Sequence, residues 1–286
     1  MRDNPWLERR VIAYAHQGGA KEAPSSTLYA MRRALEHGAT GIELDVHATS
    51  DGELVVCHDP ALDRTTNSTG EFAGLRLEEV RHLDNAYWFC PGEGAVRGRP
   101  VEDYVLRGQA PDDRDLCVAT LAEVLEAFPG VVLNLDIKRS APEVVPYEEA
   151  LAEVLREYGR QNDVVVASFS DEATGEFAKY APGTGIAAGT EATTEFYRRL
   201  RAGEAPQDGI ERYVALQVPA RFGPLVVVDE SFVEAAHSSG LAVHVWTIDD
   251  PDEMEHLVSL GVDGIISDKP SVLEGVLSRL GSNWKV

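Results

Sequence analysis

Short runs of β-branched and other apolar residues alternate with longer amphipathic segments along most of the chain. This alternation is typical of repeated β–α units. The apolar runs predict strands that begin near Val11, Gly41, Val131, Val164, Gly185, Tyr213, Leu241 and Val262. The periodic segments between them predict helices over residues 26–37, 120–128, 142–158, 170–180, 192–202, 229–240, 250–260 and 270–280. Ser170 and Asp250 stand where N-caps are expected.

Eight β–α units in a chain of 286 residues indicate an α/β fold, a parallel (β/α)₈ or TIM barrel. The interval between the second and third predicted strands is much longer than the others. We therefore expect a small insertion after the second strand, at about residues 59–118, with a β-hairpin through residues 53–58 near its start. The prediction is a single domain over residues 1–286.

Composition supports a folded chain, since 44% of the residues are hydrophobic. The net charge of −22 opposes binding to nucleic-acid phosphates or to anionic lipid surfaces. No uncharged apolar run reaches the roughly 18–20 residues that a bilayer-spanning helix needs. We therefore expect a small-molecule substrate, no nucleic-acid partner and no stable membrane anchoring.

The three cysteines and the first ten residues indicate the cellular compartment to expect. The three cysteines, Cys57, Cys90 and Cys117, are odd in number and lack C-x-x-C spacing, so free thiols in a reducing compartment are the simpler interpretation. The first ten residues are too charged for a secretory signal. The expected location is cytoplasmic, and the sequence does not indicate an oligomeric state.

Candidate chemistry lies where the predicted strands end, which is where barrel enzymes place their active sites. The first strand ends in His16, the second contains Glu43 and Asp45, and the third contains Asp136 followed by Lys138. Because side chains alternate along a strand, Glu43 and Asp45 share a face, as do Asp136 and Lys138. His58 follows the expected hairpin.

Three converging carboxylates would repel one another and raise their own pKa values unless a cation lay between them. Oxygen ligands of this kind suit one divalent cation, Mg²⁺ or Ca²⁺. Two histidines could act as general acid and base, and a lysine could bind an anionic oxygen. The set predicts metal-assisted attack on a phosphate ester.

The sequence also resembles the glycerophosphodiester phosphodiesterase family from about Val11 to Leu280. The strongest stretches are Gly41–Val46, Thr49–Gly52, Val55–Asp59 and Leu62–Thr66. Later matches are Thr120–Leu125, Leu135–Lys138, Ser168–Phe169, Val245–Thr247 and Gly261–Pro270.

The resemblance implies a metal-dependent hydrolase of lipid and glycerol metabolism that converts glycerophosphodiesters to glycerol 3-phosphate and an alcohol. It implies that His16 and His58 are the acid–base pair and that Glu43, Asp45 and Asp136 are the metal ligands. It also implies that Lys138 contacts the phosphate and that Trp246 lines the substrate pocket. The histidine that acts as acid and the attacking hydroxyl, from water or from the glycerol itself, stay open.

The chain departs from the family pattern at three places. The usual H-R-G reads His16-Gln17-Gly18, so a neutral glutamine stands where an arginine normally meets the phosphate. The usual P-E-N-T reads Pro24-Ser25-Ser26-Thr27, and the third metal position is aspartate, Asp136, instead of glutamate. Loss of one charge of each sign favours a shifted substrate preference over decay of the site.

Two other functions are compatible with the sequence. One is a lysophospholipase-D-like activity, with the aromatic run Tyr87-Trp88-Phe89 as a candidate apolar rim, although the favoured interpretation is that these residues form the small core of the insertion. The other is a non-catalytic binding barrel, which retention of both histidines, the strand-two carboxylates and Lys138 argues against. His47 shares the face of Glu43 and Asp45 and is a weaker candidate ligand.

Overall fold

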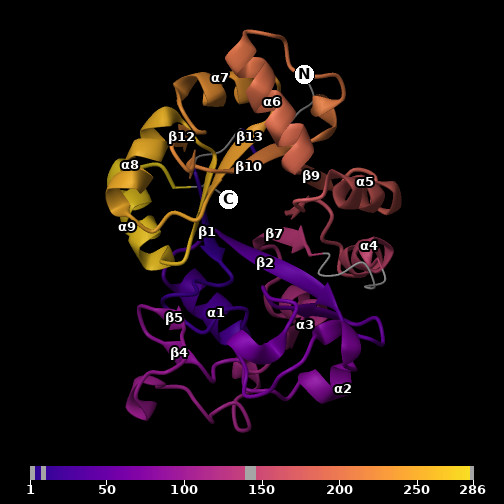
Figure 1. Cartoon of the computed structure of the whole chain (residues 1–286), viewed down its shortest axis with the longest axis vertical. Helices are drawn as coiled ribbons and strands as arrows, with labels where there is room; N and C mark the ends of the chain where they lie inside the picture. Colours follow the sequence, from indigo (N-terminus) through magenta and orange to yellow (C-terminus); the bar gives the residue numbers. More distant parts are fainter. Residues whose placement is uncertain (1–3, 8–10, 139–145, 284–286) are drawn as a thin grey trace.

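A closed barrel of parallel strands forms the centre of the molecule (Figure 1). The computed structural model describes residues 4–7, 11–138 and 146–283. The barrel strands are β1 (Ile12–His16), β2 (Gly41–Ala48), β7 (Val132–Ile137), β8 (Val164–Ala167), β9 (Gly185–Ala188), β10 (Ala215–Pro219), β13 (Ala242–Trp246) and β14 (Gly264–Ser267). Pairing of β1 with both β14 and β2 closes the sheet, so the predicted (β/α)₈ barrel is confirmed.

Helices surround the barrel and connect its strands (Figure 1). They are α1 (Leu28–Glu36), α3 (Leu121–Ala127), α4 (Glu148–Glu157), α5 (Asp171–Tyr180), α6 (Thr190–Ala202), α7 (Glu230–Ser238), α8 (Pro251–Leu260) and α9 (Pro270–Leu280). The predicted caps Ser170 and Asp250 accept hydrogen bonds from the first turns of α5 and α8. Residues 142–145 of the helix predicted over 142–158 lie outside the described residues.

The segment between β2 and α3 leaves the barrel and folds at one end of the molecule (Figure 1). β3 (Leu54–Val56) runs back antiparallel to the end of β2, and β6 (Ala119–Thr120) pairs with β3. Between them lie α2 (Leu77–Val80), the short strands β4 (Phe89–Cys90) and β5 (Gly94–Ala95), and single 3₁₀ turns. The predicted hairpin through residues 53–58 is thus formed by β3 with β2 itself.

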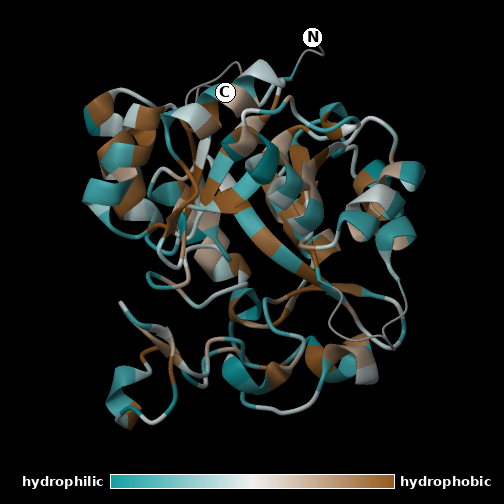
Figure 2. Ribbon diagram, turned by 45° about the horizontal axis from the view of Figure 1, so that its top comes forward, coloured by the Kyte–Doolittle hydropathy of each residue, from teal (hydrophilic) through white to brown (hydrophobic). Residues whose placement is uncertain are grey.

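Apolar side chains fill two layers, inside the barrel and between the barrel and the helices. Figure 2 shows the apolar strands enclosed by helices with polar residues on their outer faces. Ile12, Tyr14, Val132 and Val165 pack inside the barrel with Trp6 of the N-terminal segment. This inner cluster includes the first residues of β1 and β7. The opposite, carboxyl-terminal ends of the strands carry the polar residues of the site.

A second hairpin follows β10. It consists of β11 (Arg221–Phe222) and β12 (Leu225–Val226), two exposed antiparallel strands. Gly223 in its turn has φ +57°, a left-handed conformation that glycine adopts readily. The sequence did not predict this hairpin, because two-residue strands carry too little periodicity.

Candidate active site

Strand register brings the predicted site residues together. His16 on β1 pairs with Glu43 on β2, and Asp45 on β2 pairs with Asp136 on β7. Lys138 lies just beyond the end of β7. The alternation of side chains therefore directs the three carboxylates towards the carboxyl-terminal mouth of the barrel.

Lys138 is the cation that accompanies these carboxylates. Its Nζ lies 2.9 Å from Asp45 Oδ1 and 2.7 Å from Asp136 Oδ2. Burial lowers the pKa of Lys138, but the two carboxylates outweigh burial and raise that pKa above its ordinary value. The side chain is therefore a fixed positive charge at the mouth of the barrel.

The carboxylates carry more buried negative charge than Lys138 neutralises. Burial, followed by repulsion from Asp45, raises the pKa of Glu43 to about 8. Burial also raises the pKa of Asp136. Asp45 Oδ2 is buried and has no hydrogen-bond partner among the described residues. A group that supplies positive charge to these oxygens would relieve the cost of burying them.

A divalent cation fits this requirement by the chemistry of its donors, since Glu43, Asp45 and Asp136 offer oxygen ligands. In the part of the chain that the structure describes, no three His, Cys, Asp or Glu side chains are arranged around a common point as ligands. Asp45 and Asp136 are instead bridged by Lys138 Nζ.

His16 stands at the edge of the carboxylate cluster, with an aspartate behind it. Its Nδ1 lies 2.6 Å from Asp268 Oδ1, and its Nε2 lies 3.8 Å from Glu43 Oε2. Burial lowers the pKa of the imidazole, but the hydrogen bond to Asp268 and the charge of Glu43 together raise it to about 9. Asp268 therefore orients His16 and stabilises its charged form. Asp268 was not among the site residues that the sequence predicted.

His58 is supported in the same way from the other side of the site. Its Nδ1 lies 2.6 Å from Asp59 Oδ1, and Arg64 Nε lies 2.7 Å from Asp59 Oδ2. The hydrogen bond to His58 is the largest of the effects that lower the pKa of Asp59, to about 2. The two imidazole rings are 6.4 Å apart between centroids. Each ring thus has Nδ1 bound to a carboxylate, and Nε2 is the nitrogen that is turned away from that carboxylate.

Gln17 is placed differently from the other predicted site residues. Its side chain is buried, and Nε2 lies 3.1 Å from His16 Nε2. Its backbone N–H donates to Glu43, and its φ of +52° is unusual for a residue other than glycine. Gln17 therefore contacts His16 and Glu43, and its role in substrate binding stays a prediction. Ser25 is also buried, and its Oγ has no hydrogen-bond partner among the described residues.

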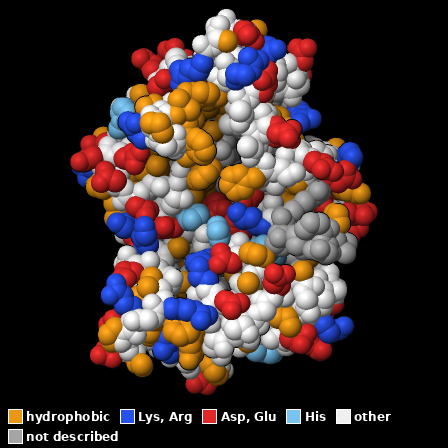
Figure 3. Space-filling view, viewed as in Figure 1, with side chains coloured by type: hydrophobic (Ala, Val, Ile, Leu, Met, Phe, Trp, Pro, Cys, Tyr) orange, Lys and Arg blue, Asp and Glu red, His pale blue; other side chains and the backbone are white. Residues whose placement is uncertain are grey.

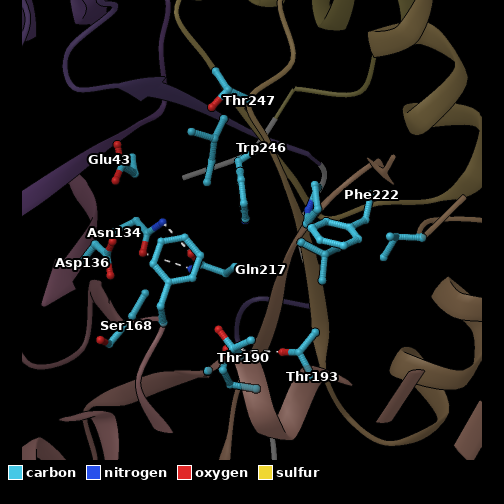
Figure 4. Close-up of a pocket in the computed structure, with 18 of the residues that line it drawn as sticks. Glu43, Asn134, Asp136, Ser168, Thr190, Thr193, Gln217, Phe222, Trp246 and Thr247 are labelled. Atoms are coloured by element: carbon cyan, nitrogen blue, oxygen red, sulfur yellow. Dashed lines mark hydrogen bonds between the residues drawn. The ribbon is translucent and has the colours of Figure 1, made fainter. Parts of the chain in front are cut away.

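A cavity of about 550 Å³ opens above the carboxylates. Every predicted site residue except Gln17 lines it, including Trp246 at the end of β13. Figure 4 shows Glu43 and Asp136 on one side of this space and Phe222 on the other, with Trp246 between them. Asn134 and Gln217 bond reciprocally across the barrel, at 3.1 and 3.0 Å, and line the same cavity.

His47, the weaker candidate ligand, does not line this cavity. His47 is buried, stacks on Phe72 and bonds through Nε2 to the backbone oxygen of His58 at 3.2 Å. It therefore helps to hold the segment that carries His58. Cys57 is buried, which raises its thiol pKa to about 12 and makes it a poor nucleophile.

The aromatic run Tyr87-Trp88-Phe89 does not form an apolar rim of the cavity. The Arg107 guanidinium lies over the rings of Tyr87, Trp88 and Tyr104, and Trp88 Nε1 donates to the backbone oxygen of Thr66. None of these three aromatics lines the cavity within the described residues. They hold the insertion together, as the second interpretation of the run expected.

Among the described residues, no helix is both long and apolar enough to cross a bilayer.

Comparisons with known proteins place the chain in one family. The sequence pattern of the glycerophosphoryl diester phosphodiesterase family matches residues 16–272. A glycerophosphodiester phosphodiesterase of Caldanaerobacter subterraneus is 31% identical over 278 residues, which cover 95% of this chain and 100% of the relative. A Bacillus subtilis enzyme of the same name is 28% identical, over 93% of this chain and 86% of its own.

Solved structures share the fold. The crystal structure of a glycerophosphodiester phosphodiesterase from Agrobacterium tumefaciens matches with a TM-score of 0.69 and 25% identity, over 93% of this chain and 98% of that one. A phosphodiesterase of Oleispira antarctica, solved with sn-glycerol 3-phosphate, matches with a TM-score of 0.67 and 23% identity, over 93% and 96% of the two chains. The match of the family pattern and the extent of the Caldanaerobacter alignment show that this chain belongs to the glycerophosphoryl diester phosphodiesterase family.

Proposed function

We propose that this protein hydrolyses glycerophosphodiesters to glycerol 3-phosphate and an alcohol, with the aid of one divalent cation. The observation that carries the proposal is the pair of carboxylate-supported histidines, His16–Asp268 and His58–Asp59, which face each other beside buried carboxylates and Lys138. The family and the names of its relatives support the same substrate class.

The two histidines account for the proton transfers. One imidazole accepts a proton from the hydroxyl that attacks phosphorus, and the other donates a proton to the alkoxide that leaves. The bond between phosphorus and the alcohol oxygen breaks, and the net reaction consumes one water. Asp268 and Asp59 bind Nδ1 of the two rings, so Nε2 is the nitrogen that would transfer the proton, and on His16 the Gln17 amide would have to release it first. The carboxylates also stabilise the imidazolium that forms on each ring.

Lys138 and the carboxylates account for the charge on the phosphate. The Lys138 ammonium can neutralise part of the charge that grows on the non-bridging oxygens in the transition state. Glu43, Asp45 and Asp136 would hold Mg²⁺ or Ca²⁺, which polarises a phosphoryl oxygen when bound. Asn134 and Gln217 close the floor of the cavity with a neutral, fully paired amide contact.

Charge and cysteine chemistry support the proposed setting. A net charge of −22 disfavours nucleic acid and anionic membranes as partners, which leaves a small phosphodiester as substrate. Cys57, Cys90 and Cys117 are buried free thiols, which suit a reducing, cytoplasmic location.

The test is an assay of the purified protein with Mg²⁺ or Ca²⁺ against glycerophosphocholine, glycerophosphoethanolamine and glycerophosphoglycerol. Release of glycerol 3-phosphate is followed with a coupled dehydrogenase. We expect turnover of at least one diester, abolished by excess chelator and restored by the cation. No release from any of the diesters with either cation would overturn the proposal, and full activity in chelator would overturn its metal dependence.

A further inference from the structure

A second ion pair lies behind the aspartate that contacts His16. Oδ1 of Asp268 lies 2.6 Å from Nδ1 of His16, whereas Oδ2 of Asp268 lies 3.6 Å from Nζ of Lys21. The Lys21 ammonium donates in turn to Oδ2 of Asp249 at 2.5 Å. Each carboxylate oxygen of Asp268 therefore has its own partner, an imidazole on one side and an ammonium on the other.

Asp249 also fixes the backbone that carries Asp268. Its Oδ1 accepts from the backbone N–H of Asp268 at 2.9 Å and from the hydroxyl of Ser267 at 3.0 Å. Asp249 follows β13, and Asp268 follows β14, so this carboxylate joins the loops after the last two barrel strands. It thus holds the backbone of Asp268 directly and the side chain of Asp268 through Lys21.

Lys21 is held by its backbone as well as by its side chain. Its N–H donates to the backbone oxygen of Asp268 at 3.2 Å, and its own backbone oxygen accepts from Gly92 of the insertion at 2.7 Å. The hydrogen bond to Asp249 raises the pKa of Lys21 above its ordinary value, so the ammonium keeps its charge at neutral pH. A fixed positive charge therefore stands beside Asp268.

The other histidine is supported by the same three kinds of group. Asp59 contacts Nδ1 of His58 through Oδ1 and Arg64 through Oδ2. Figure 3 shows histidines at the hollow on this face, with basic and acidic side chains close beside them. Because two separate loops reach the same order of imidazole, carboxylate and cation, the cation is part of how each ring is held.

Lys21 and Asp249 are placed to act through Asp268 and not on a substrate. The described residues that line the cavity include His16 but none of these three. A cation at Oδ2 opposes rotation of the Asp268 carboxylate, and the carboxylate in turn orients the imidazole. Misplacement of a reacting group by about 1 Å can lower a rate by about 100-fold.

We propose that Lys21 and Asp249 are positioning residues that hold Asp268, and thereby His16, in the orientation that proton transfer needs. This role rests on the proposed diester hydrolysis, in which His16 moves a proton. Loss of either residue should therefore lower kcat and leave KM for a diester within about twofold of its wild-type value.

The first measurement separates the charge of Lys21 from its bulk. We expect kcat on glycerophosphocholine to fall by about 10- to 100-fold in Lys21→Met and to stay within about threefold in Lys21→Arg, which keeps the charge. Asp249→Ala should lower kcat at least as much as Lys21→Met. Lys179→Met is the matched control, since it removes an ion pair of the same length, 2.5 Å to Glu176, from the surface of α5. Circular dichroism checks that each variant folds.

A double-mutant cycle tests whether Lys21 acts through Asp268. In an Asp268→Ala background, Lys21→Met should lower kcat by no more than about twofold, because the carboxylate that Lys21 positions is then absent. A general structural contribution of Lys21 would instead persist in that background. The same loss of kcat in both backgrounds would overturn the proposal.

A spectroscopic signal follows the ring without any turnover. The proton between His16 Nδ1 and Asp268 should give a downfield imidazole N–H resonance in the free protein, assigned by its loss in His16→Gln. We expect it to shift or broaden in Lys21→Met and Asp249→Ala, and to stay unchanged in Lys179→Met. The corresponding resonance of His58 with Asp59 serves as the reference in each spectrum.

The outcomes separate this role from the proposed function. Absence of turnover of every diester by the wild-type protein would contradict the proposed function, and the His16 resonance would still test the positioning. A raised KM with unchanged kcat in Lys21→Met would indicate direct contact with the substrate. That result, or a His16 resonance that responds to neither Lys21→Met nor Asp249→Ala, would overturn the positioning role.

Discussion

Lys138 and Gln17 lie in the same site but differ in what each can offer to a bound phosphate. Lys138 lies at the mouth of the barrel, lines the cavity and bridges two carboxylates. Gln17 is buried, does not line the cavity and lies against Nε2 of His16. Only Lys138 therefore offers a full charge to a phosphate in the cavity.

We expect Lys138→Ala to lower kcat/KM by at least about 100-fold, as removal of one transition-state donor does elsewhere. Gln17→Arg should give no gain on glycerophosphocholine, because the larger guanidinium would have to fit at a buried position that contacts His16. The measurement is kcat/KM of the three proteins on one substrate. A large gain from Gln17→Arg alone would show that the site is a weakened form of the ordinary one.

The sequence predicted the members of the site better than their supporting residues. His16, Glu43, Asp45, Asp136 and Lys138 could be predicted because strand ends meet at one edge of a barrel. Asp268 could not, since it is 252 residues from His16 in the chain and follows the last strand, where a turn explains an aspartate equally well. One signal was available, because Asp268 stands at the carboxyl end of a barrel strand.

At the scale of elements, strand positions followed from sequence because buried parallel strands form continuous apolar runs. All eight predicted strands are present, and helix ends agree where N-caps such as Ser170 and Asp250 mark them. The favoured interpretation of the aromatic run Tyr87–Phe89, as the small core of the insertion, agrees with its packing. Contacts with Arg107, which lies 20 residues from Tyr87, decide how that aromatic run packs.

Two glycines in regular elements should respond oppositely to alanine. A Cβ on Gly41 in β2 would lie 2.8 Å from ring carbons of Tyr14, inside the barrel. We expect Gly41→Ala to destabilise the fold by about 1–3 kcal/mol through overpacking. Gly175 in α5 has open space around its Cβ position, so Gly175→Ala should stabilise by about 0.5–1 kcal/mol. Urea unfolding measures both, and equal effects of the two changes would contradict the packing of β2 on β1.

The contact between His237 on α7 and Asp263, just before β14, should make the stability of the fold depend on pH. The hydrogen bond to Asp263, at 2.8 Å, raises the pKa of His237 above its ordinary value. The charged His237–Asp263 pair therefore stabilises the fold fully below the unfolded-state histidine pKa of about 6.5. This stabilisation is lost as pH rises through the folded-state pKa. His237→Gln should lower the urea midpoint more at about pH 5.5 than at about pH 9. His256→Gln, on the exposed face of α8, is the control, and an equal loss at both pH values would contradict the ion pair.

At the scale of the whole molecule, the net charge of −22 gives a cation two ways to raise Tm. It can screen the repulsion between acidic residues in general, or it can bind at one site. Added Mg²⁺ or Ca²⁺ should raise Tm by roughly 5 °C at a hundredfold excess over Kd, since binding then adds about 2.7 kcal/mol. Asp45→Asn/Asp136→Asn should abolish this shift. Glu102→Gln/Asp103→Asn, which removes two exposed carboxylates from the insertion, should keep it. Equal shifts in both variants would indicate general screening instead of a site.

The central claim is phosphodiester hydrolysis by the paired histidines, and phosphorus NMR of glycerophosphocholine with enzyme and cation tests it most directly. The account predicts that the diester resonance is replaced by that of glycerol 3-phosphate. His16→Ala and His58→Ala should each slow this conversion by about 10²–10⁴, whereas His256→Ala on the surface of α8 should not. A persistent diester resonance with the wild-type protein, or conversion at the wild-type rate by either site variant, would contradict the account.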